Sequence, residues 1–364
     1  MADRYWVGGT GNWNTTNTTN WSASPGGASG ASVPTAADSV FFDRTGTYTV
    51  TIGGGDGSDG NCLNLTVSAG TVAFQRGGGG GGGNLFIYGS MSLIATTTFN
   101  QEGMSFTFGA TTAGQTITTN GVVLRGSCTF NGVGGSWILQ DAVTLGFIEH
   151  INGTINLNGK TLTTSGYQTF TGTKNITFNG GSLVLTDSGG SPFNNTNSSG
   201  FSTTAGTGTG TISMTGGGTN TKTFIGGNST FNCTLNLGGA GTGALTITGN
   251  NTFNNITNTA QPITILFTAG TTTTFNNFNL SGTAGNPITI GSATAASHTL
   301  SKSSGTVSVN YLSISRSTAT GGATWTAANS TNGGNNTGWI ITAPIPGVSL
   351  ATGLTIGNGI TFSY

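Results

Sequence analysis

Apolar and polar residues alternate over short segments along most of the chain. In residues 48–52 the apolar Tyr48, Val50 and Ile52 alternate with threonines, and residues 63–67 and 154–158 have the same period. A period of two places successive side chains on opposite faces of a β-strand. Gly or Asn, which favour tight turns, follows each segment within three residues. The pattern therefore predicts an all-β chain made of many short strands.

A longer repeat is superimposed on these strands. Similar segments begin at Thr230, Thr252 and Thr274 with a constant spacing, and each has a phenylalanine in second place. Repeats of roughly 20 to 25 residues built from short strands are typical of a parallel β-helix, in which each turn hydrogen-bonds to the next. We therefore predict a parallel β-helix (solenoid) with small capping segments at both ends. The alternative is an antiparallel β-sandwich, because Asn-Gly pairs such as Asn120-Gly121 also suit hairpins.

The N-terminal segment differs from the repetitive part. Residues 1–44 contain Trp6, Trp13 and Trp21 among glycine, asparagine and threonine. Aromatic residues at this density, in a segment too polar for a core of its own, suggest a lid over the open end of a β structure. We predict that residues 1–44 form a cap or attachment segment and that residues 45–315 form the β-helix body.

The C-terminal segment also differs. Residues 316–342 contain Trp325 and Trp339 on either side of an Asn/Gly-rich loop, and we predict a second cap there. Residues 343–364 begin with prolines and continue with many apolar and almost no charged residues. Such a segment is poorly suited to free exposure, so we expect it to contact a neighbouring subunit or a particle.

Composition narrows the functional classes. With 66 glycines and 5% charged residues, the chain lacks the residues that carry the helices of ordinary helical or α/β enzymes. Nine basic and nine acidic residues give a net charge of +0, and no Lys/Arg cluster suits a phosphate backbone, so nucleic acid is not an expected partner. No segment reaches the length of a membrane span, and the first ten residues do not resemble a secretory signal. We expect no membrane insertion, and release from the cell by lysis.

Acidic residues are the first candidates for chemistry. Glu102, Asp141, Glu149 and Asp187 are the only acidic residues after residue 60. Glycoside hydrolases use paired carboxylates, and two of these side chains could meet on adjacent turns. Their spacing does not follow the repeat, so isolated, solvated acids at turns are the simpler interpretation. We expect no enzymatic activity and no cofactor, with a glycan depolymerase as the alternative.

A short acidic segment resembles a calcium loop. Asp56 and Asp59 lie in the sequence DGSDGN at 56–61. The later ligands of an EF-hand loop are missing, and the segment stands alone, whereas calcium-binding β-rolls repeat their aspartates. We therefore interpret it as an Asp/Gly turn and name Asp56 and Asp59 as the only candidate metal ligands.

Cys62, Cys128 and Cys233 form no CxxC pair, and we expect them to be buried.

Motifs at the two ends resemble a known group of proteins. The sequence RYWVGGTGNW at 4–13, with GGATW at 321–325 and NSTNGGNNTGW at 329–339, is similar to Gly/Thr/Asn-rich bacteriophage virion structural proteins of the fibre, spike or decoration type. The resemblance implies a virion protein and carries over no catalytic residues.

These observations predict a bacteriophage virion structural protein that presents a rigid β-helical rod on the particle surface. The expected partners are other copies of the chain, as a homotrimer, other virion proteins and a host surface glycan. One alternative is a tailspike enzyme that degrades host surface polysaccharide. The other is a passive carbohydrate-binding adhesin whose exposed tryptophans stack on sugars.

Overall fold

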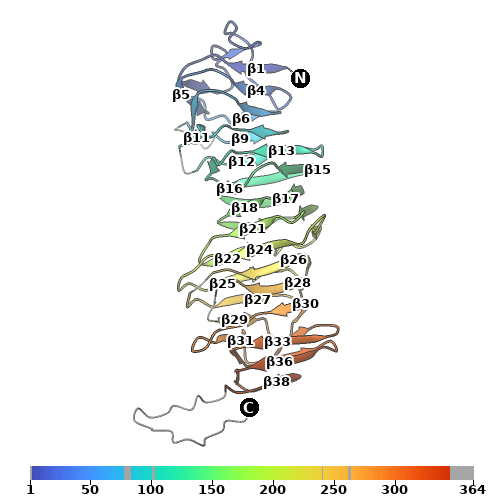
Figure 1. Ribbon diagram of the computed structural model, residues 1–364. Helices are drawn as coiled ribbons and strands as arrows, with labels where there is room; N and C mark the ends of the chain where they lie inside the picture. The colour runs from blue at the N-terminus through green and yellow to red at the C-terminus, as the bar shows by residue number, and fades with distance from the viewer. Residues whose placement is uncertain (1, 78–82, 101–102, 240, 261–263, 345–364) are drawn as a thin grey trace, which may run out of the picture.

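The chain winds into one long coil of β-strands. The computed structural model describes residues 2–77, 83–100, 103–239, 241–260 and 264–344, which contain 38 strands and no helix. Figure 1 shows the turns following one another from β1 (Asp3–Trp6) at one end to β38 (Trp339–Ile341) at the other. About 13 turns are present. At about 4.8 Å per turn they give a rod of roughly 60 Å.

The strands pair in parallel. Apart from the pair β1–β3 (Trp21–Ser22) and one isolated bridge between Thr283 and Asn286, every strand pairing among the described residues is parallel. The predicted parallel β-helix is confirmed, and the antiparallel sandwich is excluded. One turn has three strand positions, which we call the first, second and third faces. In a single turn these are β19 (Gly166–Thr169), β20 (Lys174–Thr177) and β21 (Ser182–Leu185).

The first face forms a continuous ladder in which each strand pairs with the next. Besides β19 it contains β6 (Gly60–Cys62), β9 (Leu85–Ile87), β12 (Phe106–Phe108), the starts of β15 (Cys128–Leu139) and β17 (Phe147–Asn156), β22 (Gly190–Asn194), β25 (Lys222–Ile225), β27 (Leu245–Thr248), β29 (Thr264–Phe267), β31 (Ile288–Ser292), β34 (Leu312–Ile314) and β37 (Thr331–Asn332).

The second face begins with β1. It continues through β4 (Ser39–Phe42), β7 (Leu65–Val67), β10 (Met91–Ser92), β13 (Gln115–Thr118), the ends of β15 and β17, β20, β23 (Phe201–Thr204), the starts of β26 (Thr230–Leu237), β28 (Thr252–Asn258) and β30 (Thr272–Asn279), β32 (His298–Ser301) and β35 (Ser317–Thr320).

The third face begins with β2. Its strands are β2 (Gly11–Trp13), β5 (Thr47–Ile52), β8 (Thr71–Arg76), β11 (Thr98–Phe99), β14 (Val123–Leu124), β16 (Val143–Leu145), β18 (Thr161–Thr164), β21, β24 (Gly210–Met214), the ends of β26, β28 and β30, β33 (Thr306–Asn310), β36 (Thr324–Ala328) and β38.

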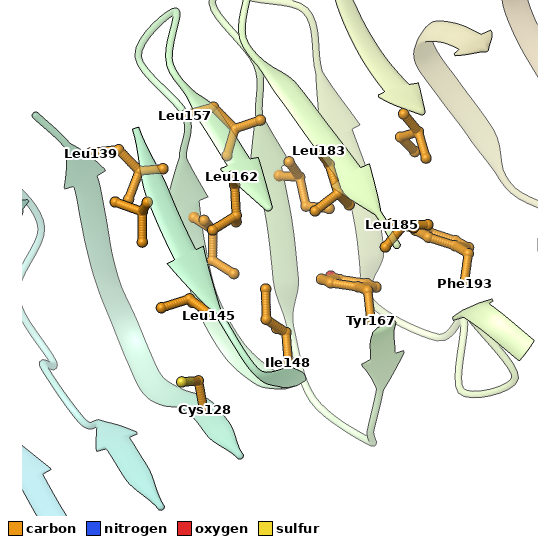
Figure 2. Close-up of a cluster of buried hydrophobic side chains, with 14 of the residues drawn as sticks. Cys128, Leu139, Leu145, Ile148, Leu157, Leu162, Tyr167, Leu183, Leu185 and Phe193 are labelled. Carbon is orange, nitrogen blue, oxygen red and sulfur yellow. The ribbon is translucent and has the colours of Figure 1, made fainter. Parts of the chain in front are cut away.

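Inward-facing side chains of successive turns stack in rows inside the coil. Figure 2 shows one such row, in which Cys128, Ile148, Tyr167 and Phe193 follow one another across four turns in register. The rings of Tyr167 and Phe193 are parallel, with centroids 5.2 Å apart. Alternation of buried and outward residues along each strand builds this core, because successive side chains point to opposite faces. All three cysteines are buried free thiols, as expected.

The phenylalanines of the repeat occupy equivalent positions. Phe231 pairs with Phe253, and Phe253 pairs with Phe275. Their rings are stacked, with centroids 4.9 Å and 6.1 Å apart, and all three are buried. The prediction drawn from the spacing of these residues is therefore confirmed.

Asn-Gly pairs form corners of the coil, and the hairpin interpretation of them is wrong. Between the second and third faces, Asn120, Asn158 and Asn179 all have positive φ values of 48° to 50°, and each is followed by a glycine with positive φ. Asparagine and glycine tolerate this left-handed backbone better than other residues. The Asn120 and Asn158 side chains also donate to carbonyls of the preceding turn, Leu93 and Leu139, so the same residue turns the chain and joins two turns.

Tryptophans close the N-terminal end. The rings of Trp6, Trp13 and Trp21 are at most 1% exposed and pack on one another edge to face, at centroid distances of 5.0 and 5.2 Å. All three also pack against Phe42 in the next layer. The antiparallel strand β3 folds back on β1 and closes this end of the coil.

A second pair of tryptophans lies near the C-terminal end. Trp325 is buried against Trp339, with centroids 5.0 Å apart, and both contact Phe278.

Parallel pairing extends into both end segments, through β1 with β4 and through β36 with β38, so it is not confined to residues 45–315. The proposed domain limits stay a prediction, and residues 345–364, which form most of the predicted tail, lie outside the described residues.

Two histidines lie inside the core. The Nε2 of His150 donates to the Gly153 carbonyl at 3.0 Å, so Nδ1 accepts from the Tyr167 hydroxyl at 2.7 Å. His298 stacks on Phe267 at 4.9 Å, and neither of its ring nitrogens has a hydrogen-bond partner among the described residues. Burial lowers the pKa of His150 to about 3 and that of His298 to about 4. Both rings are therefore neutral in the folded protein near neutral pH.

Replacing Phe253 by alanine tests the stacked core. Phe253→Ala removes a buried ring that lies between two others, and we expect a loss of about 3–5 kcal/mol in the free energy of unfolding. The matched control is Thr246→Ala on the outward side of β27, which should change stability by less than about 0.5 kcal/mol. Guanidinium denaturation followed by circular dichroism measures both. Equal effects of the two changes would contradict the stacked arrangement.

Acidification tests the buried histidine. The pKa of His298 is about 6.5 in an unfolded chain and about 4 in the fold, so between these values the unfolded state binds more protons. The free energy of unfolding must then fall as the pH falls from about 6.5 towards 4. His298→Phe keeps the stack on Phe267 and removes this dependence, so its melting temperature should exceed that of the parent chain by more at pH 4 than at pH 7. If the difference in melting temperature between the two proteins is the same at pH 4 as at pH 7, the lowered pKa of His298 is contradicted.

Candidate functional site

Asp141, one of the predicted acidic candidates, holds a corner of the coil. It lies between β15 and β16, and its carboxylate accepts the backbone N–H of Thr119 at 3.0 and 3.1 Å and that of Asn120. These donors belong to the same corner in the preceding turn. The carboxylate therefore ties two successive corners together, which is a structural task.

Glu149 lies elsewhere on the coil. It is on the outward side of β17 in the first face, where its Oε2 accepts the Thr129 hydroxyl at 2.9 Å, and its neighbour in the next turn is Gln168. His150, the next residue along the strand, points into the core. The sequence pair Glu149-His150 therefore does not form an acid–base pair in space, because adjacent residues of a strand face opposite sides.

Asp187 lies at a third position, the corner between the third and first faces. Its Oδ1 accepts the Gly189 N–H at 3.1 Å in a local turn. Glu102, the fourth predicted candidate, lies outside the described residues. The structure thus distributes Asp141, Glu149 and Asp187 around the coil, and each is held by hydroxyl or backbone N–H donors. Paired carboxylates of the kind that cleaves glycosides would have to face one another.

The Asp56–Asp59 segment is a hydrogen-bonded turn. Both oxygens of Asp56 accept hydrogen bonds, one from the N–H and hydroxyl of Ser58 and the other from the N–H and hydroxyl of Thr15. These bonds, those of Ser58 foremost, lower the pKa of the Asp56 carboxyl. Asp59 accepts the N–H of Asn84 in the next turn at 2.9 Å. Across the described part of the chain, no group of three His, Cys, Asp or Glu side chains could hold a metal ion.

Most of the terminal tryptophans are not exposed to a sugar in solution. The rings of Trp6, Trp13, Trp21 and Trp325 are buried in the ends of the coil, and Trp339 is partly covered. A sugar could reach these four rings only after the ends had opened.

The described residues also contain no helix long and apolar enough to cross a membrane.

The outer surface carries several open hollows. One of about 430 Å³ lies at the N-terminal end, beside Asp43 and Arg44. Another, of about 520 Å³, adjoins Asp141, and one of about 310 Å³ lies beside Val133, whose side chain is 71% exposed.

A fourth hollow of about 430 Å³ lies where the third face meets the first, and we call it the third-face hollow. It is lined by Val123, Arg125, Thr144, Leu145, Gly146, Thr163, Thr164, Ser165 and Thr186. Sequence reasoning did not identify these residues. They come from four turns, and only the register of the coil brings them together.

No protein-family model, no curated protein and no solved structure matches this chain.

Proposed function

We propose that this chain is a structural component of a virus particle, a fibre, spike or capsid decoration that presents a stiff rod on the particle surface. The observation that carries the proposal is the unbroken ladder of the first face. From β6 to β37, each strand of this face pairs with the strand of the same face in the next turn.

A continuous ladder supports a mechanical role. Each turn hydrogen-bonds to the turns before and after it and shares one apolar interior with them, so bending at any point would break backbone bonds and open the core. The rings that run through the interior add to this stiffness. Phe193 and Phe224, for example, stack with centroids 4.5 Å apart.

The ends of the rod support use as a separate surface element. Strands at the end of a sheet tend to pair with other chains unless they are covered. Here three buried tryptophans and β3 cover the N-terminal end. At the other end Ile340 on β38 is 56% exposed, which makes that end the better candidate for attachment.

Under this proposal the partners are other copies of the chain, as a homotrimer, and further virion proteins. A chain with nine basic and nine acidic residues and a net charge of +0 offers little charge repulsion between copies. The protein would be assembled in the host cytoplasm and released in the virion by lysis.

Purified particles of the virus that encodes the chain test the proposal. Quantitative mass spectrometry should find a fixed copy number per particle, and cryo-electron microscopy should show rods of about 60 Å per subunit. Particles assembled with Phe253→Asp, which places a charge in the core, should lack the protein. Particles assembled with the outward-facing control Thr246→Asp should retain it. Recovery of the unmodified chain only as free protein in the lysate would overturn the proposal.

A further inference from the structure

The third-face hollow results from a column of unequal side chains. At the corner between the third and first faces, the Gly146 N–H donates to the Leu124 carbonyl, the Ser165 N–H donates to the Gly146 carbonyl, and the Thr186 N–H donates to the Thr164 carbonyl. The register of the adjoining strands places Arg125, Gly146, Ser165 and Thr186 in one column on four successive turns. A long side chain stands at one end, while the middle holds a glycine and a serine. The surface is therefore recessed between the turns of Arg125 and Thr186.

Backbone packing fixes the glycine in this column. A Cβ at residue 146 would lie 2.3 Å from the carbonyl oxygens of both Arg125 and Gly126. No other residue fits there without moving the backbone of residues 125–126 in the preceding turn. The recess is thus a rigid property of the fold and does not depend on the rotamer of one side chain.

The lining of the hollow is part polar and part apolar, and it includes one exposed cation, Arg125. The Arg125 side chain is exposed and has no hydrogen bond or ion pair with any other described residue. The hydroxyls of Ser165 and Thr186 donate to the backbone carbonyls of Gly146 and Thr164, which leaves their oxygens free to accept. The wall also contains Thr144 and Thr163, which are outward-facing residues of the third face.

Polar side chains continue from the hollow along the rod. One outward column of the third face reads Thr144, Thr163, Val184, Ser213, Asn236, Thr257 and Asn279 on consecutive turns. The adjacent column reads Thr161, Ser182, Thr211, Thr234, Asn255 and Asn277. Apart from Ser213, which is buried, these side chains are at least partly exposed, so a chain molecule lying along the rod would meet small side chains, nearly all with hydroxyl or amide groups, about every 4.8 Å.

We propose that the third-face hollow binds a carboxylate-bearing sugar unit of an acidic polysaccharide, whose chain continues along these polar columns. The Arg125 guanidinium matches the planar fork of a carboxylate. Hydroxyls that donate and accept suit a polyhydroxylated ring, and the methyl groups of Thr144 and Thr163 can contact its apolar edges. The volume of about 430 Å³ falls within the range of small-molecule sites, roughly 300–1,000 Å³. This inference adds a binding activity to the proposed structural role and does not depend on it.

Calorimetric titration of the whole chain tests the site. The probes are an oligogalacturonate, an oligomannuronate and a sialyl oligosaccharide, together with the methyl-esterified oligogalacturonate as the uncharged comparison. We expect saturable binding of at least one acidic probe in the millimolar range or tighter, weakened by added salt because the contact is exposed. Esterification should weaken the binding of oligogalacturonate if that is the probe that binds.

Three variants locate the binding. Arg125→Ala should weaken the affinity about tenfold or more, because it removes a charge-assisted hydrogen bond. Thr144→Val combined with Thr163→Val keeps the shape of the wall, removes two hydroxyls, and should weaken binding several-fold. Arg44→Ala removes the same charge at the N-terminal end and should leave the affinity unchanged. Circular dichroism confirms that each variant is folded.

Two outcomes would overturn the inference. One is that none of the acidic probes binds up to high millimolar concentration. The other is that Arg125→Ala, folded and stable, binds as tightly as Arg44→Ala. Either result leaves the virion proposal untouched, because that proposal is tested by the presence of the chain in particles.

Discussion

The backbone hydrogen bond between one turn and the next is the interaction on which the rest of this structure depends. It holds residues of successive turns in register, so each side chain stands directly above and below another. Stacking of like on like follows, as with Phe253 between two phenylalanines, and with Asn276, which donates to Asn254 at 3.3 Å. The same bonds give the rod its stiffness, because no turn can move without breaking the ladder.

The composition is explained by this constraint. A charge repeated in every turn would meet its own kind at about 4.8 Å, which is strongly unfavourable, and threonine, serine and asparagine avoid that repulsion. Only 5% of the residues are charged. Asparagine and glycine also supply the left-handed backbone at the corners. The few acids act within the same scheme, since Asp141 and Asp59 each accept an N–H from another turn.

Differences in side-chain size between successive turns change the shape of the outer surface. Inside the coil, substitutions are limited by close packing, and the ends are covered by rings such as Trp6, Trp21 and Trp325. On the outer surface, a change from a long to a short side chain within one column forms a hollow, as it does between Arg125 and Gly146. A rigid scaffold with variable outward columns is well suited to presenting a binding surface.

The sequence by itself determined the strands and the repeat and favoured parallel stacking over a sandwich, because alternation and the recurrence of Phe231, Phe253 and Phe275 are properties of the chain alone. It also identified the clusters of tryptophan at both ends. Which outward residues share a column was decided only by the tertiary structure. Paired residues of successive turns are separated by 18 residues for Trp137 and Ile155 but by 31 residues for Phe193 and Phe224. With turns of such unequal length no fixed period can be extended along the chain, so neither the separation of Asp141, Glu149 and Asp187 nor the third-face hollow could be read from the sequence.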